Sequence, residues 1–380
     1  MRTSPPPTLG VEEEFLVVAP DTGQPVPLGS RVVRCAAERF GVELDVELST
    51  AQVETRTAVC HDLADVRRQL SDLRAVAAES ARRVGARLLA VGAPPIGGPE
   101  TGIGDQGRYG QLKDDYRMLA AEQSICGCHV HVAVPDAETA VQVCNHVRPW
   151  LPVLGLLTAN SAIARGRDTG YASWRSVVWS RWPSAGPPPY FESFDHYRRT
   201  CDVLLEAGAA RDLRMIYWDV RPSAHLPTVE VRVADVASTV DEAVLFAALV
   251  RALVTTALAD LGRGLRGSPV PGELLRTASW RAARDGLGGR ALDVFSGRLV
   301  PARLLVDRLV HVVRDALCAS GDLESVQRLL SAVDRSGTGA DRQRRAFREA
   351  RNAAGLVGRL ADETLLGCER WSVAAVPGPR

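Results

Sequence analysis

Residues 8–18 read TLGVEEEFLVV, and the argument about the fold starts from this stretch. Its valines, leucine and phenylalanine favour a β-strand, yet Glu12, Glu13 and Glu14 follow one another within it. Side chains alternate between the two faces of a strand, so Glu12 and Glu14 project together, roughly 6–7 Å apart, while Glu13 joins the apolar face. Neighbouring carboxylates on a half-buried surface repel each other unless a cation lies between them. The stretch therefore indicates either a divalent-metal site or a solvated edge strand whose charges prevent aggregation.

Later segments repeat this alternation of aliphatic and polar side chains. The polar pairs are His129/His131 in GCHVHVAV, Glu230/Arg232 in TVEVRVAD and, more loosely, Glu54/Arg56 in AQVETRT. The aliphatic residues between them imply one sheet that packs on helices by that face. The opposite face is then expected to form a single polar cleft.

The residue types in this cleft indicate which metal it binds. Carboxylates with one or two histidines favour Mg²⁺ or Mn²⁺ over Zn²⁺, although Cys126 and Cys128 beside His129 leave a zinc site open. Mg²⁺ held by carboxylates usually completes its shell with water and nucleotide phosphates, and arginines grip phosphate or carboxylate. The sequence has no Walker-type loop, so a nucleotide is expected to be held through metal ions and arginines.

Composition excludes several other classes of function. The 380 residues carry a formal net charge of +1, which gives no general attraction to nucleic acid or to an anionic membrane. Lys113 is the only lysine, so a catalytic lysine is nearly excluded. The longest apolar runs are interrupted by Pro152 and Gly155 or by Arg251, and neither reaches the length of a membrane span. Eight cysteines without an apolar leader at the N-terminus indicate reduced thiols in the cytoplasm.

Hydrophobic periodicity predicts the secondary structure. Helices are expected over residues 30–40, 62–84, 114–123, 136–164 (broken near 149–152), 194–207 and 241–259. Extended segments are expected over 42–57, 87–93, 215–220 and 228–235. Residues 94–107 read as a mobile Pro/Gly-rich loop, and 165–190 as a long ordered loop with a functional role. No repeat or shift in composition marks a boundary, so we expect one catalytic domain, with a sheet-forming core over about 8–260 and a helical part over about 261–370.

Five motifs point to a known family: GVEEEF, AQVET, GCHVHV, TGYASWR and WDVRPSAHLPTVEVRVAD. Together they resemble the carboxylate–amine ligases of the glutamate–cysteine ligase type 2 group, the YbdK-like family. The resemblance runs from about residue 9 to 235 and continues weakly through the C-terminal helices. The pairs Glu230/Arg232 and His129/His131 also look like those of glutamine synthetase, whose catalytic fold this family shares. The expected fold is α+β: a curved, mostly antiparallel sheet with a polar concave face and helices packed outside.

The resemblance implies an ATP-dependent ligase that forms an amide bond through an acyl phosphate. The γ-carboxylate of glutamate would attack the γ-phosphate of ATP, and an amine, cysteine in the namesake reaction, would displace phosphate. In that picture the ligands of Mg²⁺ (or Mn²⁺) are Glu12, Glu14, Glu54, His129 and Glu230. Arg232 would stabilise the transferred phosphate together with Glu230. Arg175 and Arg221 are the candidates for the substrate carboxylate, and Asp219, His225 and His131 are expected to orient the residues around them.

Three residues fit this picture less well. The spacing of Glu47 from Glu54 makes Glu47 a weaker metal candidate. Glu13 stands where an apolar residue is expected, and Cys128 stands where a glutamine is expected. The residues that would form the pocket for the amine are therefore not determined from the sequence. Two other functions remain: a metal-dependent hydrolase that uses His129 and His131 around a bound water, and a non-catalytic nucleotide- or amino-acid-binding protein of the same fold. Small molecules are the expected partners, and relatives suggest a homodimer.

Overall fold

A seven-stranded antiparallel sheet forms the centre of the computed structural model, which describes residues 5–98, 102 and 107–368. The strand order is β2 (Asp45–Val46), β3 (Gln52–Arg56), β1 (Leu9–Val18), β5 (Gly127–Ala133), β9 (Thr228–Asp235) and β8 (Val220–Pro222), and β4 (Arg87–Leu89) also pairs with β1. Every ladder of this sheet is antiparallel. The expected α+β class with a mostly antiparallel sheet is confirmed.

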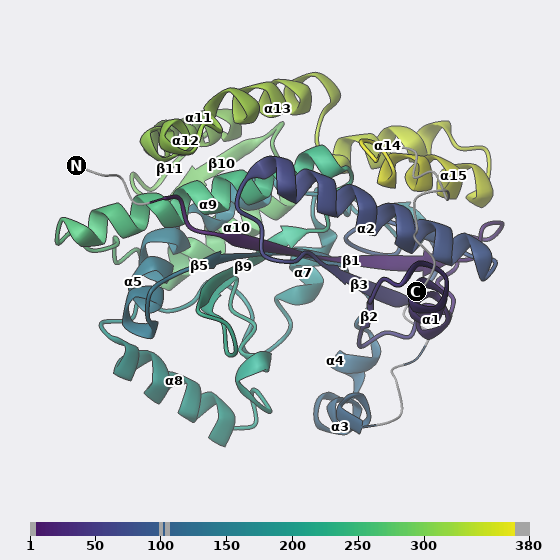
Figure 1. Ribbon diagram of the computed structural model, residues 1–380, viewed down its shortest axis with the longest axis horizontal. Helices are drawn as coiled ribbons and strands as arrows, with labels where there is room; N and C mark the ends of the chain where they lie inside the picture. The colour runs from purple at the N-terminus through teal and green to yellow at the C-terminus, as the bar shows by residue number, and fades with distance from the viewer. Residues whose placement is uncertain (1–4, 99–101, 103–106, 369–380) are drawn as a thin grey trace, which may run out of the picture.

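Helices cover the apolar face of the sheet. Figure 1 shows α2 (Leu63–Arg83) and α9 (Val240–Gly262) on one side of the strands, with α3 (Gly107–Tyr116), α4 (Met118–Ala121) and α8 (Phe194–Glu206) on the other. Val11, Val130 and Val231 point from the sheet into one core cluster together with α9. Alternation therefore sends the valines into the core and leaves the intervening polar residues on the opposite face.

Helix α9 is long and apolar enough to cross a membrane by length and composition, but two thirds of its apolar window is buried inside the protein. It packs against α2, α5 (Ala137–Val147) and β5. Its one basic residue in the interior, Arg251, pairs with Asp322 at a nitrogen–oxygen distance of 2.5 Å. It is thus a core helix, as its interruption by Arg251 predicted.

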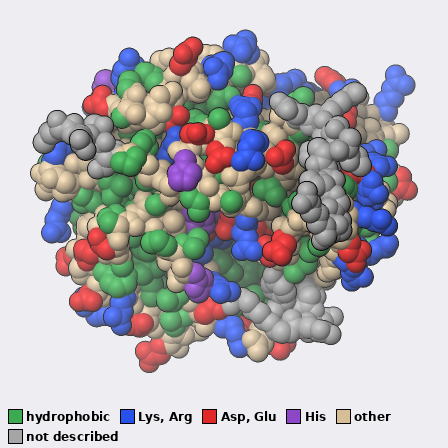
Figure 2. Space-filling view, viewed as in Figure 1, with side chains coloured by type: hydrophobic (Ala, Val, Ile, Leu, Met, Phe, Trp, Pro, Cys, Tyr) green, Lys and Arg blue, Asp and Glu red, His purple; other side chains and the backbone are tan. Residues whose placement is uncertain are grey.

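The remaining elements surround this core. They are α1 (Gly29–Phe40), α6 (Leu151–Thr158), α7 (Trp174–Trp179), α10 (Gly272–Asp285), α11 (Ala302–Val312), α12 (Arg314–Ser320), α13 (Leu323–Ser336), α14 (Gly339–Glu349), α15 (Ala353–Thr364), the short pair β6 (Ile163–Ala164) and β7 (Arg167–Asp168), and the hairpin β10 (Arg290–Asp293) and β11 (Arg298–Pro301). Acidic and basic side chains are interspersed over the face shown in Figure 2, in keeping with the net charge near zero.

Some sequence-based boundaries were wrong. The strand expected over 215–220 is a 3₁₀ turn, Leu213–Met215, followed by β8, because Arg221 takes up the carbonyls of Leu213, Arg214 and Ile216. The expected loop over 165–190 contains α7, and the helix expected over 114–123 is divided between α3 and α4. The helix expected over 136–164 ends at Thr158, and the expected helical C-terminal part also carries β10 and β11. Half of the predicted mobile loop over 94–107 lies outside the described residues.

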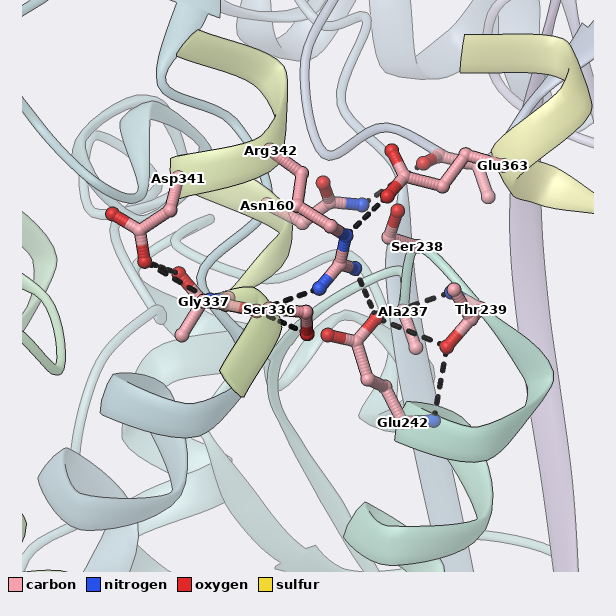
Figure 3. Close-up of polar contacts among 12 residues, drawn as sticks. Asn160, Ala237, Ser238, Thr239, Glu242, Ser336, Gly337, Asp341, Arg342 and Glu363 are labelled. Atoms are coloured by element: carbon pink, nitrogen blue, oxygen red, sulfur yellow. Dashed lines mark hydrogen bonds and ion pairs between the residues drawn. The ribbon is translucent and has the colours of Figure 1, made fainter. Parts of the chain in front are cut away.

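Arg342 joins the C-terminal helices to the sheet-bearing part of the chain (Figure 3). From α14, its guanidinium contacts Glu242 in the first turn of α9 and Glu363 on α15, and it donates to the carbonyl of Gly337. Glu242 also belongs to the capping box of α9 with Thr239. One largely buried arginine thus links three helices, while the division of the chain near residue 260 stays a prediction.

Candidate active site

The register of the sheet brings the predicted polar pairs onto one face, since directly paired residues of antiparallel strands point the same way. The paired positions are Glu12 with His129, Glu14 with Glu54, and Glu230 with both His131 and Arg221. Strand β9 carries one extra residue opposite His129, a β-bulge at Arg232 and Val233. The bulged backbone N–H of Arg232 donates to the carbonyl of Asp219 at 2.8 Å.

These side chains line a cavity of about 680 Å³. All the predicted site residues except Asp219 contribute to its wall: Glu12, Glu14, Glu54, His129, His131, Arg175, Arg221, His225, Glu230 and Arg232. The wall also includes Glu47, Trp179, Trp182 and Tyr217. The expected single polar cleft is therefore present. The aromatic residues were not predicted individually, although Trp179 and Trp182 belong to the segment 165–190 that was expected to be functional.

Three groups of potential metal ligands lie side by side in the cavity. They are Glu12/His131/Glu230, Glu12/Glu54/His129 and Glu14/Glu47/Glu54, each with its ligand atoms within 4.8 Å of one another. The buried Nε2 atoms of His129 and His131 have no hydrogen-bond partner among the described residues. Nδ1 of His131 lies 3.0 Å from Thr228 Oγ1, which leaves Nε2 directed to the carboxylates. Carboxylate oxygens with unpartnered imidazole nitrogens fit a divalent cation that prefers oxygen.

Charge is distributed unevenly between these groups. Burial, with the negative charge of Glu14, raises the pKa of Glu47 to about 8, and burial with Glu47 raises the pKa of Glu54 well above its ordinary value. At the other end burial acts against ionisation, but Arg232 and Arg221 outweigh it and hold the pKa of Glu230 well below its usual range. On the side with Glu14, Glu47 and Glu54, the positive charges of Arg56 and Arg232 do not offset burial and mutual repulsion, as is expected of a cation site before its ion binds.

Arg232 connects the ligand groups to the aromatic wall. Its Nη1 contacts Glu230 and lies 3.5 Å from Nδ1 of His129. Its guanidinium carbon lies 5.8 Å from the ring centre of Trp179 and 5.9 Å from that of Tyr217. Its Nε is buried without a partner among the described residues, so this donor is available for an anion.

The two candidates for the substrate carboxylate differ in their surroundings. Arg221 uses Nε on Glu230 at 2.8 Å and Nη1 on three backbone carbonyls, which favours a role in holding Glu230. Arg175 on α7 donates to the carbonyls of Arg232 and Val233, and its buried Nε has no partner among the described residues. A Cβ at Gly127 would lie 2.4 Å from Nη2 of Arg175, so glycine makes room for this guanidinium.

The residues expected to orient the site fall into three places. His131 lies at the ligand positions themselves, 3.5 Å from Glu12. His225 is exposed at the cavity wall and accepts a hydrogen bond from Nε of Arg214 at 2.6 Å. Asp219 lines a different cavity, and only its backbone reaches Arg232. His225 and Asp219 thus lie farther from the potential metal ligands than the sequence suggested.

The opposite face of β1 and β5 carries no ligand set among the described residues. Glu13 is fully buried and pairs with Arg74 of α2, with Oε1–Nη2 at 2.6 Å and Oε2–Nε at 2.9 Å. Cys126 and Cys128 lie in apolar clusters, and burial raises the pKa of both thiols well above the ordinary value. Among the described residues neither thiol belongs to a potential metal group, so the cysteines give no support to the zinc alternative.

Comparison with known proteins identifies the family of the chain. Residues 8–363 match glutamate-cysteine ligase family 2. The chain belongs to this family. It is 51% identical over 362 residues to a Nocardia farcinica protein, covering 95% of this chain and 94% of that protein, whose name, glutamate–cysteine ligase 2-1, is marked as provisional. The resemblance stated from the motifs is confirmed, and the reaction class is that of an ATP-dependent ligase that forms an amide bond.

Solved structures share the fold. A glutamate–cysteine ligase from Francisella tularensis in complex with AMP matches with a TM-score of 0.65 and 14% identity, covering 96% of this chain and 94% of that chain. A bifunctional glutathione synthetase from Pasteurella multocida matches with a TM-score of 0.67 and 16% identity, covering 96% of this chain and 53% of that chain. Ligase folds of this kind are thus retained at very low identity.

Proposed function

We propose that this chain uses ATP and Mg²⁺ to join the γ-carboxylate of glutamate to the amine of a small amino acid, with cysteine as the first candidate. The observation that carries the proposal is the meeting of three carboxylate- and histidine-based ligand groups with Arg232 in one cavity. A glutamate oxygen attacks the γ-phosphorus of ATP and ADP leaves. The amine nitrogen, after losing its proton, then attacks the acyl carbon, and inorganic phosphate leaves.

The residues that would hold Mg²⁺ are Glu12, Glu14, Glu47, Glu54, His129, His131 and Glu230. Ions bound there would offset the charge that spreads over the transferring phosphoryl group. The list adds Glu47 and His131 to the ligands expected from the sequence, since both lie within ligand distance of the others.

The arginines supply the fixed positive charge. Arg232, with its unpartnered Nε, is placed to donate to the phosphoryl oxygens and stabilise their charge in the transition state. Arg175 is the candidate for the substrate carboxylate, and its carbonyl contacts hold the guanidinium in place before substrate binds. Arg221 positions Glu230. Trp179 and Tyr217 narrow the cavity and keep water from the acyl phosphate.

The test is phosphate release from ATP and Mg²⁺ with L-glutamate and each of a panel of amines, with mass spectrometry of the product. We expect phosphate matched by a γ-glutamyl amide. Turnover without nucleotide would support the hydrolase instead, and nucleotide binding without product for any pair would support the binding protein. Glu230→Ala should abolish metal-dependent turnover, whereas Glu38→Gln, an exposed change on α1, should not. A homodimer and a cytoplasmic location remain part of the proposal.

A further inference from the structure

A second cavity, of about 450 Å³, lies behind α7. We call it the rear cavity. Its walls come from α6, α7, α10 and the segment that precedes β8. Arg175 and Trp179 line both this cavity and the active-site cavity, so they form a common wall. The volume falls within the roughly 300–1,000 Å³ that small-molecule sites occupy.

Buried polar atoms in the rear cavity have no partners within the described chain. Oγ of Ser279, Nε1 of Trp179 and Nε of Arg175 are buried and have no hydrogen-bond partner among the described residues. Asp219, which is 6% exposed, also lines the cavity, but its carboxylate oxygens are not among these buried unpartnered atoms. Most buried polar groups in proteins are satisfied, so several orphans around one cavity indicate that something else satisfies them.

The polar groups that line the rear cavity differ in charge and in whether they donate or accept hydrogen bonds. The carboxylate of Asp219 can only accept, whereas the nitrogens of Arg175 and Trp179 can only donate. Burial raises the pKa of Asp219 to about 6, and the positive charges of Arg175 and Arg232 act against that rise. A ligand that satisfies both kinds carries a cationic donor and an anionic acceptor close together.

Apolar and aromatic side chains complete the wall. Trp280 is 45% exposed, and its indole N–H donates to the hydroxyl of Tyr171 at 3.3 Å. Both line the rear cavity, together with Leu151 and Val233. Such a surface accommodates an apolar side chain beside the polar base.

We propose that the rear cavity binds a free α-amino acid outside the catalytic cleft. Its ammonium group would donate to Asp219, its carboxylate would accept from Trp179 Nε1 or Ser279 Oγ, and its side chain would pack near Trp280. Because Arg175 also lines the active-site cavity, occupancy behind α7 changes the freedom of a residue in the cleft. The inference goes beyond the proposed reaction and does not depend on which amine is ligated.

The cavity offers a matched pair of variants at Gly155 on α6. A Cβ built there meets nothing closer than a methyl carbon of Val233 at 3.9 Å, so Gly155→Ala fits, whereas the longer side chain of Gly155→Leu fills the cavity. Asp219→Asn removes the charge and keeps the shape. Together the variants separate loss of space, loss of charge and simple disturbance of α6.

Binding of a panel of L-amino acids is measured by calorimetry, with a non-hydrolysable ATP analogue and Mg²⁺ occupying the cleft. We expect at least one amino acid to bind the wild type and Gly155→Ala equally, and at least tenfold more weakly to Asp219→Asn and Gly155→Leu. If Gly155→Leu does not fold, Ser279→Ala replaces it in the comparison. No binding to the wild type, or wild-type affinity in Asp219→Asn, overturns the proposal.

A ligase assay with product analysis then identifies the role of the bound amino acid. Incorporation of that amino acid into product, with a KM raised in Asp219→Asn, makes the rear cavity the donor site. A change in rate without incorporation makes the amino acid an effector. Both results support the site, and binding is measured without turnover, so failure of the proposed reaction does not affect this test.

Discussion

Replacing Arg74 should show how much the stability of the protein depends on the buried ion pair between Arg74 and Glu13. Glu13 and Arg74 both have 0% exposed side chains, and the guanidinium bonds both carboxylate oxygens. Its remaining hydrogen bonds go to the carbonyls of Ala237, Ser238 and Thr364. Arg74→Leu leaves an unpaired buried carboxylate, which typically destabilises a protein by about 3–5 kcal/mol.

The double variant Glu13→Leu/Arg74→Leu separates the cost of the unpaired buried charge from the cost of the carbonyls that lose their donors. It removes both charges and replaces them with apolar volume, a change that is often neutral for the pair itself. Three backbone carbonyls still lose their donors, at about 1–3 kcal/mol for each buried group left unsatisfied. We therefore expect the double variant to be more stable than Arg74→Leu and less stable than the wild type.

The assay is urea unfolding followed by circular dichroism, with free energies from linear extrapolation. Arg345→Leu, an exposed change on α14, serves as the control and should remain within about 0.5 kcal/mol of the wild type. A loss below 1 kcal/mol in Arg74→Leu would refute the reasoning about the buried charge. Equal stability of the single and double variants would show that the carbonyl contacts, and not the ion pair, carry the effect.

Further predictions concern the site and the C-terminal helices. Gly127→Ala should push the guanidinium of Arg175 aside, lowering kcat/KM roughly 10–100-fold in the phosphate assay while the urea midpoint changes little. Mg²⁺ binding should release protons near pH 7, because Glu47, with a pKa of about 8, must ionise to become a ligand. The affinity for Mg²⁺ should rise with pH up to about 8. Calorimetry of Mg²⁺ binding in two buffers of different ionisation enthalpy, repeated over this pH range, checks the proton release and the affinity; equal binding heats in the two buffers would contradict the proton release. Arg342→Met should destabilise the protein by about 2 kcal/mol, since two carboxylates lose their partner, and an unchanged urea midpoint would count against this.

The shared polar face could be predicted from the sequence because it follows from a period of two. Alternation alone places Glu12 and Glu14 on one face and Glu13 on the other, and the register then follows from matching polar faces. Glu47 could not be placed in this way. It lies in the connection between β2 and β3, and only the folded chain brings it within ligand distance of Glu14.

Hydrogen bonds between side chains and the backbone explain the other secondary-structure predictions that were wrong. The segment 215–220 has strand composition, but Arg221 donates to the carbonyls of Leu213, Arg214 and Ile216, and a period of two does not reveal such a side-chain competitor. Helix α7 was missed for a similar reason. Ser173 caps it, and Asp235, distant in sequence, accepts hydrogen bonds from both Ser173 and Ser161, while Ser161 accepts from the backbone of Arg175. The position of Arg175 thus depends on contacts that a strand or helix period does not contain.

The pair Glu13–Arg74 bears directly on the chemistry of the opposite face. In a run of three glutamates, a slip of one residue would direct Glu13 into the cleft and bury Glu12 and Glu14. Only one arginine on α2 meets this face of β1 in an ion pair among the described residues, so the slipped state would bury two carboxylates with one partner. A buried ion pair contributes little to stability by itself, yet it separates these two registers by the free energy of an unpaired buried charge, about 3–5 kcal/mol. The apparently misplaced Glu13 therefore specifies which glutamates of β1 face the cleft, and the proposed metal site depends on it.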